Sequence, residues 1–370
     1  MWAGFVAYLG ALAWAPRLGR RAVWGAIVVL LAAFACLPPL LSHDVYSYVD
    51  YARLCVIHGL DPYVHAPAAA PGDQAFAHVS WTEATSAYGP LFTLASYPLA
   101  WLPVGVAVHV FKAAAALAVL ATAIVAARLA PGRGIDPLRA AAFVALNPLV
   151  LVHVVGGGHN DAFAVLLTTL GVAGILTARE TTAGAALLTA IAVKPSAALT
   201  LPFAAVASLP GPTGRYVKDD LTYRPVGPLG RLAMGAGVAA GVIGLAAYVA
   251  FGWDWLHGFA LAGENQGRTS YMSIPILTAR LSGLDTDAVR GAALALYAVL
   301  LLYLLAWSYR GGDWLRAAAW ATFSLLLATA WLLPWYLLWP LPLAALSRDN
   351  ALKLSILALT AYQLGARIPL

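Results

Sequence analysis

Long runs of uncharged, apolar residues dominate the chain, and short polar segments separate them. The clearest runs cover residues 22–41, 232–251 and 291–309, each close to the roughly 20 residues that a membrane-spanning helix needs. A longer run over 317–347 is interrupted by prolines. The pattern predicts an all-α, polytopic membrane protein with roughly nine to eleven transmembrane helices or half-helices, in which residues 1–370 form a single integral membrane domain.

The composition agrees with a chain whose solvent is the lipid bilayer. Hydrophobic residues make up 62% of the sequence and charged residues 10%, whereas soluble domains carry about 25% charged residues. The mean hydropathy is +0.79. The net charge of +6 does not indicate a nucleic-acid partner, because the basic residues are spread over short loops, as membrane insertion requires. Residues 2–15 lack a preceding basic stretch and a cleavage site, so they predict a short first helix rather than a signal peptide.

The distribution of positive charge orients the chain. Basic residues concentrate in the cytoplasmic loops of membrane proteins, so the cluster of Arg17, Arg20 and Arg21 is placed inside. Residues 42–88 then become a first extracytoplasmic loop, and residues 252–289 a later one. This threading puts most of the 22 Lys and Arg residues inside and most of the 16 acidic residues outside. We therefore expect a multi-pass plasma-membrane protein whose long, functional loops are extracytoplasmic.

Two segments must be broken for this orientation to hold. Residues 89–128 are expected to pass inward as two pieces that meet near Pro103, and residues 181–209 to form a hairpin broken at Lys194-Pro195. A lysine at bilayer depth costs about 2.5–3.5 kcal/mol on insertion scales, so Lys194 requires a partner. It could pair with a lipid phosphate. Alternatively, Pro195 breaks the helix and Lys194 reaches the nearer membrane surface.

The first extracytoplasmic loop begins with a carboxylate that directly follows the membrane exit. Asp44, Tyr48 and Tyr51 are spaced i, i+4 and i+7, which places them on one face of a helix lying along the interface. A carboxylate shielded by aromatic rings could have a raised pKa and act as a general base. The alternatives are that Asp44 is an N-cap and that the tyrosines belong to an interfacial aromatic belt.

A second candidate feature is the segment Gly156-Gly157-Gly158-His159-Asn160-Asp161, between two apolar runs. Consecutive glycines let backbone N–H groups approach an anion, and the N-terminus of the following helix favours negative charge. The alternative is that the glycines end one helix and that Asn160 or Asp161 caps the next.

Two further polar segments complete the inventory. Residues 264–271 carry a cation, Arg268, which could shape a substrate site, although a solvated connection is the alternative. Tyr88-Gly89-Pro90 has the composition of a turn. The sequence contains no metal-ligand spacing, nucleophile elbow or P-loop.

Several motifs, in order over nearly the whole chain, resemble a known family. They are HDVYSY (43–48), GLDPY (59–63), YGPLF (88–92), LNPLVLVHVVGGGHNDAF (146–163), AVKPSAALTLPF (192–203) and PWYLLWPLPLAAL (334–346). This set resembles the GT-C superfamily of membrane glycosyltransferases, in particular the actinobacterial polyprenol-phosphomannose-dependent α-(1→6)-mannosyltransferases. The resemblance implies a GT-C-like helical bundle that transfers a sugar, mannose above all, from a polyprenyl-phosphate donor to a glycan or glycolipid acceptor.

The resemblance also implies roles for particular residues. It assigns the catalytic base to Asp44. The donor phosphate and substrate are expected to contact His43, Tyr48, Tyr88, His159, Asn160, Asp161, Lys194 and Arg268. The resemblance gives no certain cofactor, and Asp161 is a candidate ligand of a divalent cation, Mg²⁺ or Mn²⁺.

A different class of function shares some of these features. Secondary transporters and lipid flippases place substrate sites near the bilayer midplane on broken helices, and Lys194-Pro195 could mark such a site. We find no second interrupted helix that matches it, and the polar residues cluster in the extracytoplasmic loops. A non-catalytic membrane scaffold is disfavoured by the acids and histidines beside the membrane exits.

Overall fold

The computed structural model describes residues 2–209, 226–264 and 267–366, and helices are the only regular elements there. The all-helical, polytopic prediction is therefore confirmed. Arg215, Lys218 and Arg224, which the charge analysis placed in a cytoplasmic loop, lie outside the described residues, as do Asn265 and Gln266 of the later loop, which that analysis placed outside the cell.

The α-helices follow one another in this order: α1 (Trp2–Cys36), α2 (Asp44–Val56), α3 (Pro90–Ser96), α4 (Val104–Leu129), α5 (Pro137–Ala145), α6 (Asp161–Leu176), α7 (Glu180–Val193), α8 (Thr200–Ala207), α9 (Pro228–Phe251), α10 (Trp255–Glu264), α11 (Ile274–Ser282), α12 (Thr286–Tyr309), α13 (Trp314–Ala328), α14 (Leu341–Ala345) and α15 (Asn350–Gly365). Short 3-10 turns lie at Pro67–Ala69, Phe76–His78, Tyr97–Trp101, Pro131–Arg133, Pro195–Leu199 and Pro334–Leu338, and a π-helical turn at Val150–Val155.

Four of the described helices, α1, α4, α9 and α12, are long and apolar enough to cross a membrane. The shortest of them have 24 residues, which corresponds to about 36 Å at 1.5 Å per residue. The remaining apolar helices are shorter. Helix α1 is kinked at Gly19, whose φ of 79° is not helical, so its first part forms the separate N-terminal helix that the sequence predicts.

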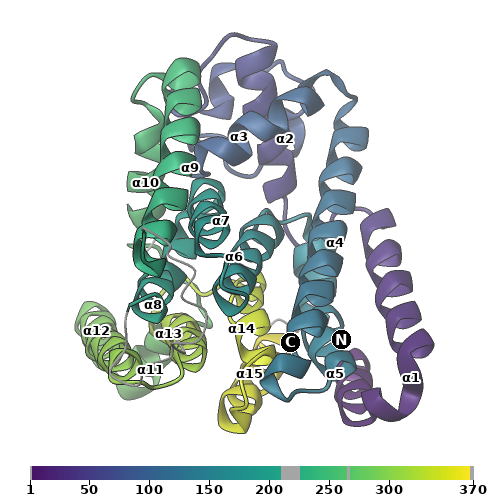
Figure 1. Ribbon diagram of the computed structural model, residues 1–370. Coiled ribbons are helices and arrows are strands. Elements are labelled where there is room, and N and C mark those ends of the chain that lie inside the picture. Colours follow the sequence, from purple (N-terminus) through teal and green to yellow (C-terminus); the bar gives the residue numbers. More distant parts are fainter. Residues whose placement is uncertain (1, 210–225, 265–266, 367–370) are drawn as a thin grey trace.

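Both predicted breaks are present, and proline causes each of them. Pro103 is the N-cap of α4, and the preceding piece consists of the short helix α3 and a 3-10 turn. Lys194 ends α7 in an extended conformation, and Pro195 starts a 3-10 turn that leads into α8. Figure 1 shows α2 and α3 together at one end of the molecule, α5 and α15 at the other, and α4 running between them.

A lysine inside α4 lies where the end of α1, the start of α2 and the turn at Gly158 meet. Lys112 is fully buried, and its Nζ donates to the carbonyl oxygens of Leu37 and Pro38, just after α1 ends. A side chain on Gly158 would meet Lys112 and Val45. Lys112 therefore satisfies two backbone carbonyl groups in the segment that follows α1, and it lies against the glycine turn (residues 156–158) beside the start of α2.

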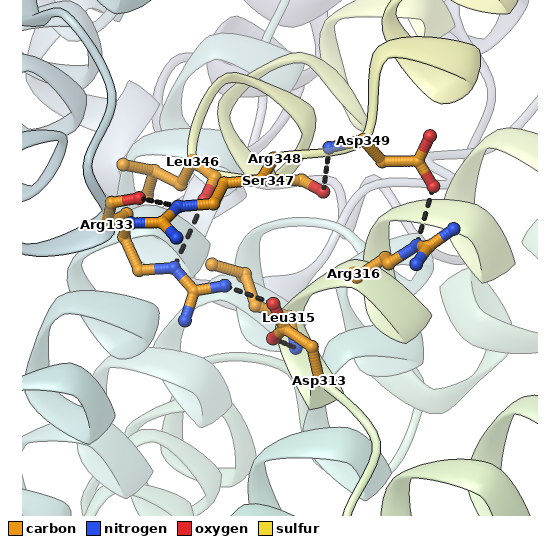
Figure 2. Close-up of polar contacts among 8 residues, drawn as sticks. All are labelled: Arg133, Asp313, Leu315, Arg316, Leu346, Ser347, Arg348 and Asp349. Atoms are coloured by element: carbon orange, nitrogen blue, oxygen red, sulfur yellow. Dashed lines mark hydrogen bonds and ion pairs between the residues drawn. The ribbon is translucent and has the colours of Figure 1, made fainter.

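An ion-pair network ties together the segments at the far end of α4 (Figure 2). Arg133 pairs with Asp313, and Arg348 Nε donates to the Arg133 carbonyl oxygen at 2.5 Å. Arg316 Nε lies 2.6 Å from Asp349 Oδ2. From Lys112 to the end of α4 the helix covers about 26 Å, so this network is distant from the first loop.

Helices α7 and α9 pack through glycines, which let their backbones approach closely. A Cβ on Gly235 would meet the Thr181 carbonyl oxygen, and one on Gly184 would meet the Leu232 carbonyl oxygen. At the same end, Arg231 and Glu180 form an ion pair with an N–O distance of 2.7 Å.

Gly235→Ala is therefore expected to destabilise the protein by about 1–3 kcal/mol, because the added methyl group forces α9 away from α7. Thermal unfolding in detergent would measure the loss. Gly237→Ala is the matched control, since a Cβ at Gly237 meets nothing within 4 Å. Equal unfolding temperatures for the two variants would contradict this account of the packing.

Candidate functional site

A cavity of about 730 Å³ lies where the first loop meets the later helices. Helices α2, α10 and α12 contribute to its wall. The rest of the wall comes from residues 81–88, His159 at the end of the glycine turn, residues 194–196 where α7 ends, Arg268, and the segment from the end of α13 to Trp339. A volume of this size is within the range of small-molecule sites. Segments that are far apart in sequence therefore converge on one space.

The helix α2 presents its predicted face to this cavity. Asp44, Tyr48 and Tyr51 all line it, as the i, i+4, i+7 spacing indicates. The N-cap alternative for Asp44 is wrong, because His43 occupies the cap position and Asp44 is the first helical residue. The aromatic-belt alternative is also wrong, since the two tyrosines are buried. His43 itself is exposed and packs on Tyr46, outside the cavity wall.

The two carboxylate oxygens of Asp44 have different neighbours. Oδ1 accepts a hydrogen bond from Trp81 Nε1 at 3.2 Å, and Oδ2 lies 3.7 Å from His159 Nδ1. Burial raises the pKa of Asp44 above its ordinary value, while the Trp81 hydrogen bond and the charge of Lys194 oppose the shift. The carboxylate is thus a stronger base than an exposed aspartate.

The glycine turn places His159 deep in the wall. Gly158 has a φ of 70°, and the His159 ring stacks on Trp335 with centroids 3.8 Å apart. Burial, reinforced by the positive charge of Lys194, lowers the pKa of His159 well below its ordinary value. His159 is therefore neutral near pH 7. A neutral ring supplies no positive charge to a phosphate, so His159 does not compensate the charge of a donor phosphate.

The backbone of the turn is directed inward. The N–H groups of Gly158 and His159 donate to Val155 and Val154, so these two groups are not free to hold an anion. Asn160 is the N-cap of α6 but makes no side-chain cap hydrogen bond. Asn160 is buried and does not line the cavity, and its side-chain amide has no hydrogen-bond partner among the described residues.

Lys194 forms an ion pair inside the protein. Its Nζ lies 2.7 Å from Asp161 Oδ2, and Trp339 Nε1 donates to Asp161 Oδ1 at 2.6 Å. The ring centroids of Tyr336 and Trp339 lie 5.3 Å and 5.8 Å from Nζ. The prediction that Lys194 reaches the nearer surface is wrong, because Asp161 neutralises it within the fold.

A second cation lines the cavity without an acidic partner among the described residues. The Arg268 guanidinium lies 4.7 Å from the centroid of the Trp81 ring and 5.8 Å from that of Trp331. Tyr88, also on the wall, packs edge-on against Tyr48, with the two ring centroids 4.8 Å apart. Arg290, by contrast, pairs with Asp287 at 2.9 Å.

The predicted metal ligand has its two oxygens engaged. Both oxygens of Asp161 accept from protein donors, and within the described ranges no three His, Cys, Asp or Glu side chains gather in a way that could hold a metal ion. A divalent cation at Asp161 stays a prediction.

Sequence reasoning missed the aromatic residues that shape the site. Trp81 is a single tryptophan in a polar loop, and no spacing connects it with Asp44. Trp335 and Trp339 lie in the PWYLLWP motif, which entered only as part of a resemblance. Lys112 could have been found, because an ionisable residue inside an apolar run marks a position with a specific partner.

Comparison with known proteins gives two family models that match the chain. Residues 1–210 match the model described as alpha-(1->6)-mannopyranosyltransferase, N-terminal domain, and residues 277–365 match the MptB C-terminal domain.

Curated relatives carry related names. Alpha-(1->6)-mannopyranosyltransferase A of Mycobacterium tuberculosis is 34% identical, over 93% of this chain and 70% of the relative. The protein of the same name from Corynebacterium glutamicum is 30% identical, over 65% of this chain and 50% of the relative. A probable alpha-(1->6)-mannopyranosyltransferase of Mycolicibacterium smegmatis is 27% identical, over 93% of this chain and 68% of the relative. No solved structure matches the chain.

Proposed function

The chain belongs to the α-(1→6)-mannopyranosyltransferase family, and on this premise we propose that it transfers mannose, with inversion, from a polyprenyl-phosphate donor. The acceptor is a hydroxyl group of a glycan or glycolipid. The observation that carries the proposal is a partly buried carboxylate with a raised pKa, Asp44, on the wall of a cavity that also holds cations and aromatic rings.

In this mechanism Asp44 takes the proton of the acceptor hydroxyl as its oxygen attacks the anomeric carbon. The bond from that carbon to the phosphate oxygen breaks, and its electron pair leaves with the polyprenyl phosphate. One displacement inverts the anomeric centre. Burial of Asp44 favours this step, because general-base catalysis is most efficient when the pKa of the base approaches the operating pH.

The leaving phosphate needs positive charge beside it, and Arg268 is the best candidate. Lys194 is largely neutralised by Asp161 at 2.7 Å, whereas the exposed Arg268 has no carboxylate partner among the described residues and lies within 6 Å of the centroids of two indole rings. Fixed aromatic contacts orient a guanidinium without consuming its hydrogen-bond donors. Lys194 then stabilises the leaving phosphate through the electrostatic field of its positive charge, without contacting it directly.

The position of the cavity suits a donor with a lipid tail. Leu294 of α12 lines the cavity and is also 50% exposed. Only 6% of the most apolar stretch of α12 is buried, so this helix presents most of its length to lipid. A prenyl chain could therefore lie along α12 while its phosphate reaches Arg268. A nucleotide donor would have no use for such an apolar wall.

Charge supports an extracytoplasmic location for the reaction. The network of Figure 2 gathers arginines at the end of α4 away from the cavity, and such clusters are typical of the cytoplasmic side. The same network disfavours a transporter, because alternating access would require those pinned segments to separate.

The test is a comparison of donors. The purified chain, reconstituted in lipid vesicles, is incubated with an oligomannoside acceptor and with mannose supplied either on a polyprenyl phosphate or on a nucleotide. We expect transfer from the polyprenyl donor and none from the nucleotide. Transfer from the nucleotide alone would overturn the assignment of the donor.

The pH dependence of kcat/KM provides a further prediction. A base works only when it is ionised, so activity is complete above the pKa of Asp44 and is lost as the pH falls through it. Since burial raises that pKa, the acid limb should lie above the ordinary value of about 3.9. Trp81→Phe removes a hydrogen bond that stabilises the anion, so its limb should lie at still higher pH. A limb at or below pH 4 in the wild type would contradict the assignment.

A further inference from the structure

The two oxygens of the Asp44 carboxylate have different partners on the cavity wall. Trp81 donates to Oδ1 at 3.2 Å, whereas Oδ2 faces His159 Nδ1 at 3.7 Å. Hydrogen bonds between nitrogen and oxygen span about 2.7–3.2 Å, so the second contact is too long for a hydrogen bond. A movement of about half an ångström would close it.

The imidazole of His159 is itself fixed. It is 1% exposed, lies at 19° to the Trp335 ring with which it stacks, and is confined by Gly157, where a Cβ would come within 2.9 Å of His159 Cδ2. Its Nε2 has no hydrogen-bond partner among the described residues. The nitrogen that can act on the site is therefore Nδ1, which lies 3.7 Å from Asp44 Oδ2.

We propose that His159 is a positioning residue, whose neutral ring donates from Nδ1 to Asp44 Oδ2 once the acceptor sugar fills the cavity. This inference rests on the proposed function. Trp81 and His159 would then hold one oxygen each, so that the remaining lone pairs of the carboxylate face the acceptor hydroxyl. A base held at two points loses less orientational freedom during the reaction than one held at a single point.

Three replacements of His159 separate this role from simple packing. His159→Phe keeps a flat ring against Trp335 but has no nitrogen. His159→Asn places an amide nitrogen close to the position of Nδ1, and His159→Gln places one closer to the position of Nε2. All three are measured in the full chain in lipid vesicles, after thermal unfolding has shown that each variant is folded.

We expect His159→Phe to lower kcat by about 10- to 100-fold with the donor KM unchanged, and to shift the acid limb of the pH profile upward because a hydrogen bond to the carboxylate is lost. His159→Asn should recover most of the rate, and His159→Gln should behave like His159→Phe. Wild-type kcat in His159→Phe, or equal losses in all three variants, would overturn the proposal. A raised donor KM with unchanged kcat would instead assign His159 to the donor phosphate.

A double variant distinguishes this inference from the proposed function. If His159 acts through Asp44, then Asp44→Asn/His159→Phe should be no slower than Asp44→Asn. A further slowing by the same factor would refute the positioning role and leave the proposed function intact. Wild-type activity in Asp44→Asn alone would refute the proposed function itself.

Discussion

Replacing Asp44 by Asn is expected to lower kcat for sugar transfer by about 10²–10⁴-fold, the usual contribution of a positioned general base. Asparagine has nearly the same shape and keeps an oxygen that accepts from Trp81 Nε1, so the local fold should persist. What it lacks is an oxygen basic enough to take the acceptor proton. The donor KM should change little, because the proposed mechanism places the lipid tail and the phosphate of the donor against other parts of the cavity.

Asp254→Asn is the matched control for this experiment. Asp254 lies between α9 and α10, outside the cavity wall, with its side chain 47% exposed and 3.9 Å from His257. Its replacement makes the same chemical change without touching the site, so the rate should stay within about twofold of wild type. Comparable losses in both variants would indicate a general effect on the folded protein and would remove the case for Asp44.

The sequence predicted the parts of this molecule that depend on local periodicity. The spacing of Asp44, Tyr48 and Tyr51 was sufficient to place them on one face, because a helix fixes the direction of side chains three and four positions apart. The breaks at Pro103 and Pro195 could also be predicted, since proline inside a helix removes a backbone hydrogen bond and clashes with the preceding turn. These features require no knowledge of tertiary contacts.

The remainder of the site depends on contacts that are distant in sequence. Lys194 pairs with Asp161, 33 positions earlier, and Trp339 reaches the same carboxylate from 178 positions away. An isolated lysine beside a proline predicts only that some partner exists, so surface exposure and phosphate binding were equally reasonable. Burial also changed the interpretation of His159, because the fold, not the residue type, determines that its ring stays neutral.

Lys194→Met is the second replacement with a large expected effect, and it acts first on stability. Asp161 is fully buried, and removal of Lys194 leaves a carboxylate whose one remaining side-chain donor among the described residues is Trp339. Breaking a buried ion pair from one side typically costs 3–5 kcal/mol, and because Lys194 is 17% exposed we expect about 3 kcal/mol. Asp287→Asn is the comparison, since its pair with Arg290 has a carboxylate that is 85% exposed and should contribute at most about 1 kcal/mol.

The double variant Lys194→Met/Asp161→Asn separates stability from catalysis. Removing both charges restores neutrality in the wall, so thermal unfolding should return most of the way to the wild-type temperature. The transfer rate should stay at least about tenfold low, because the proposed mechanism uses the positive charge of Lys194 to assist departure of the phosphate. The deficit should be smaller than the 10²–10³-fold typical of a direct oxyanion donor, since Asp161 already offsets much of the lysine charge. If activity returned together with stability, Lys194 would be a structural residue and Arg268 would carry the phosphate alone.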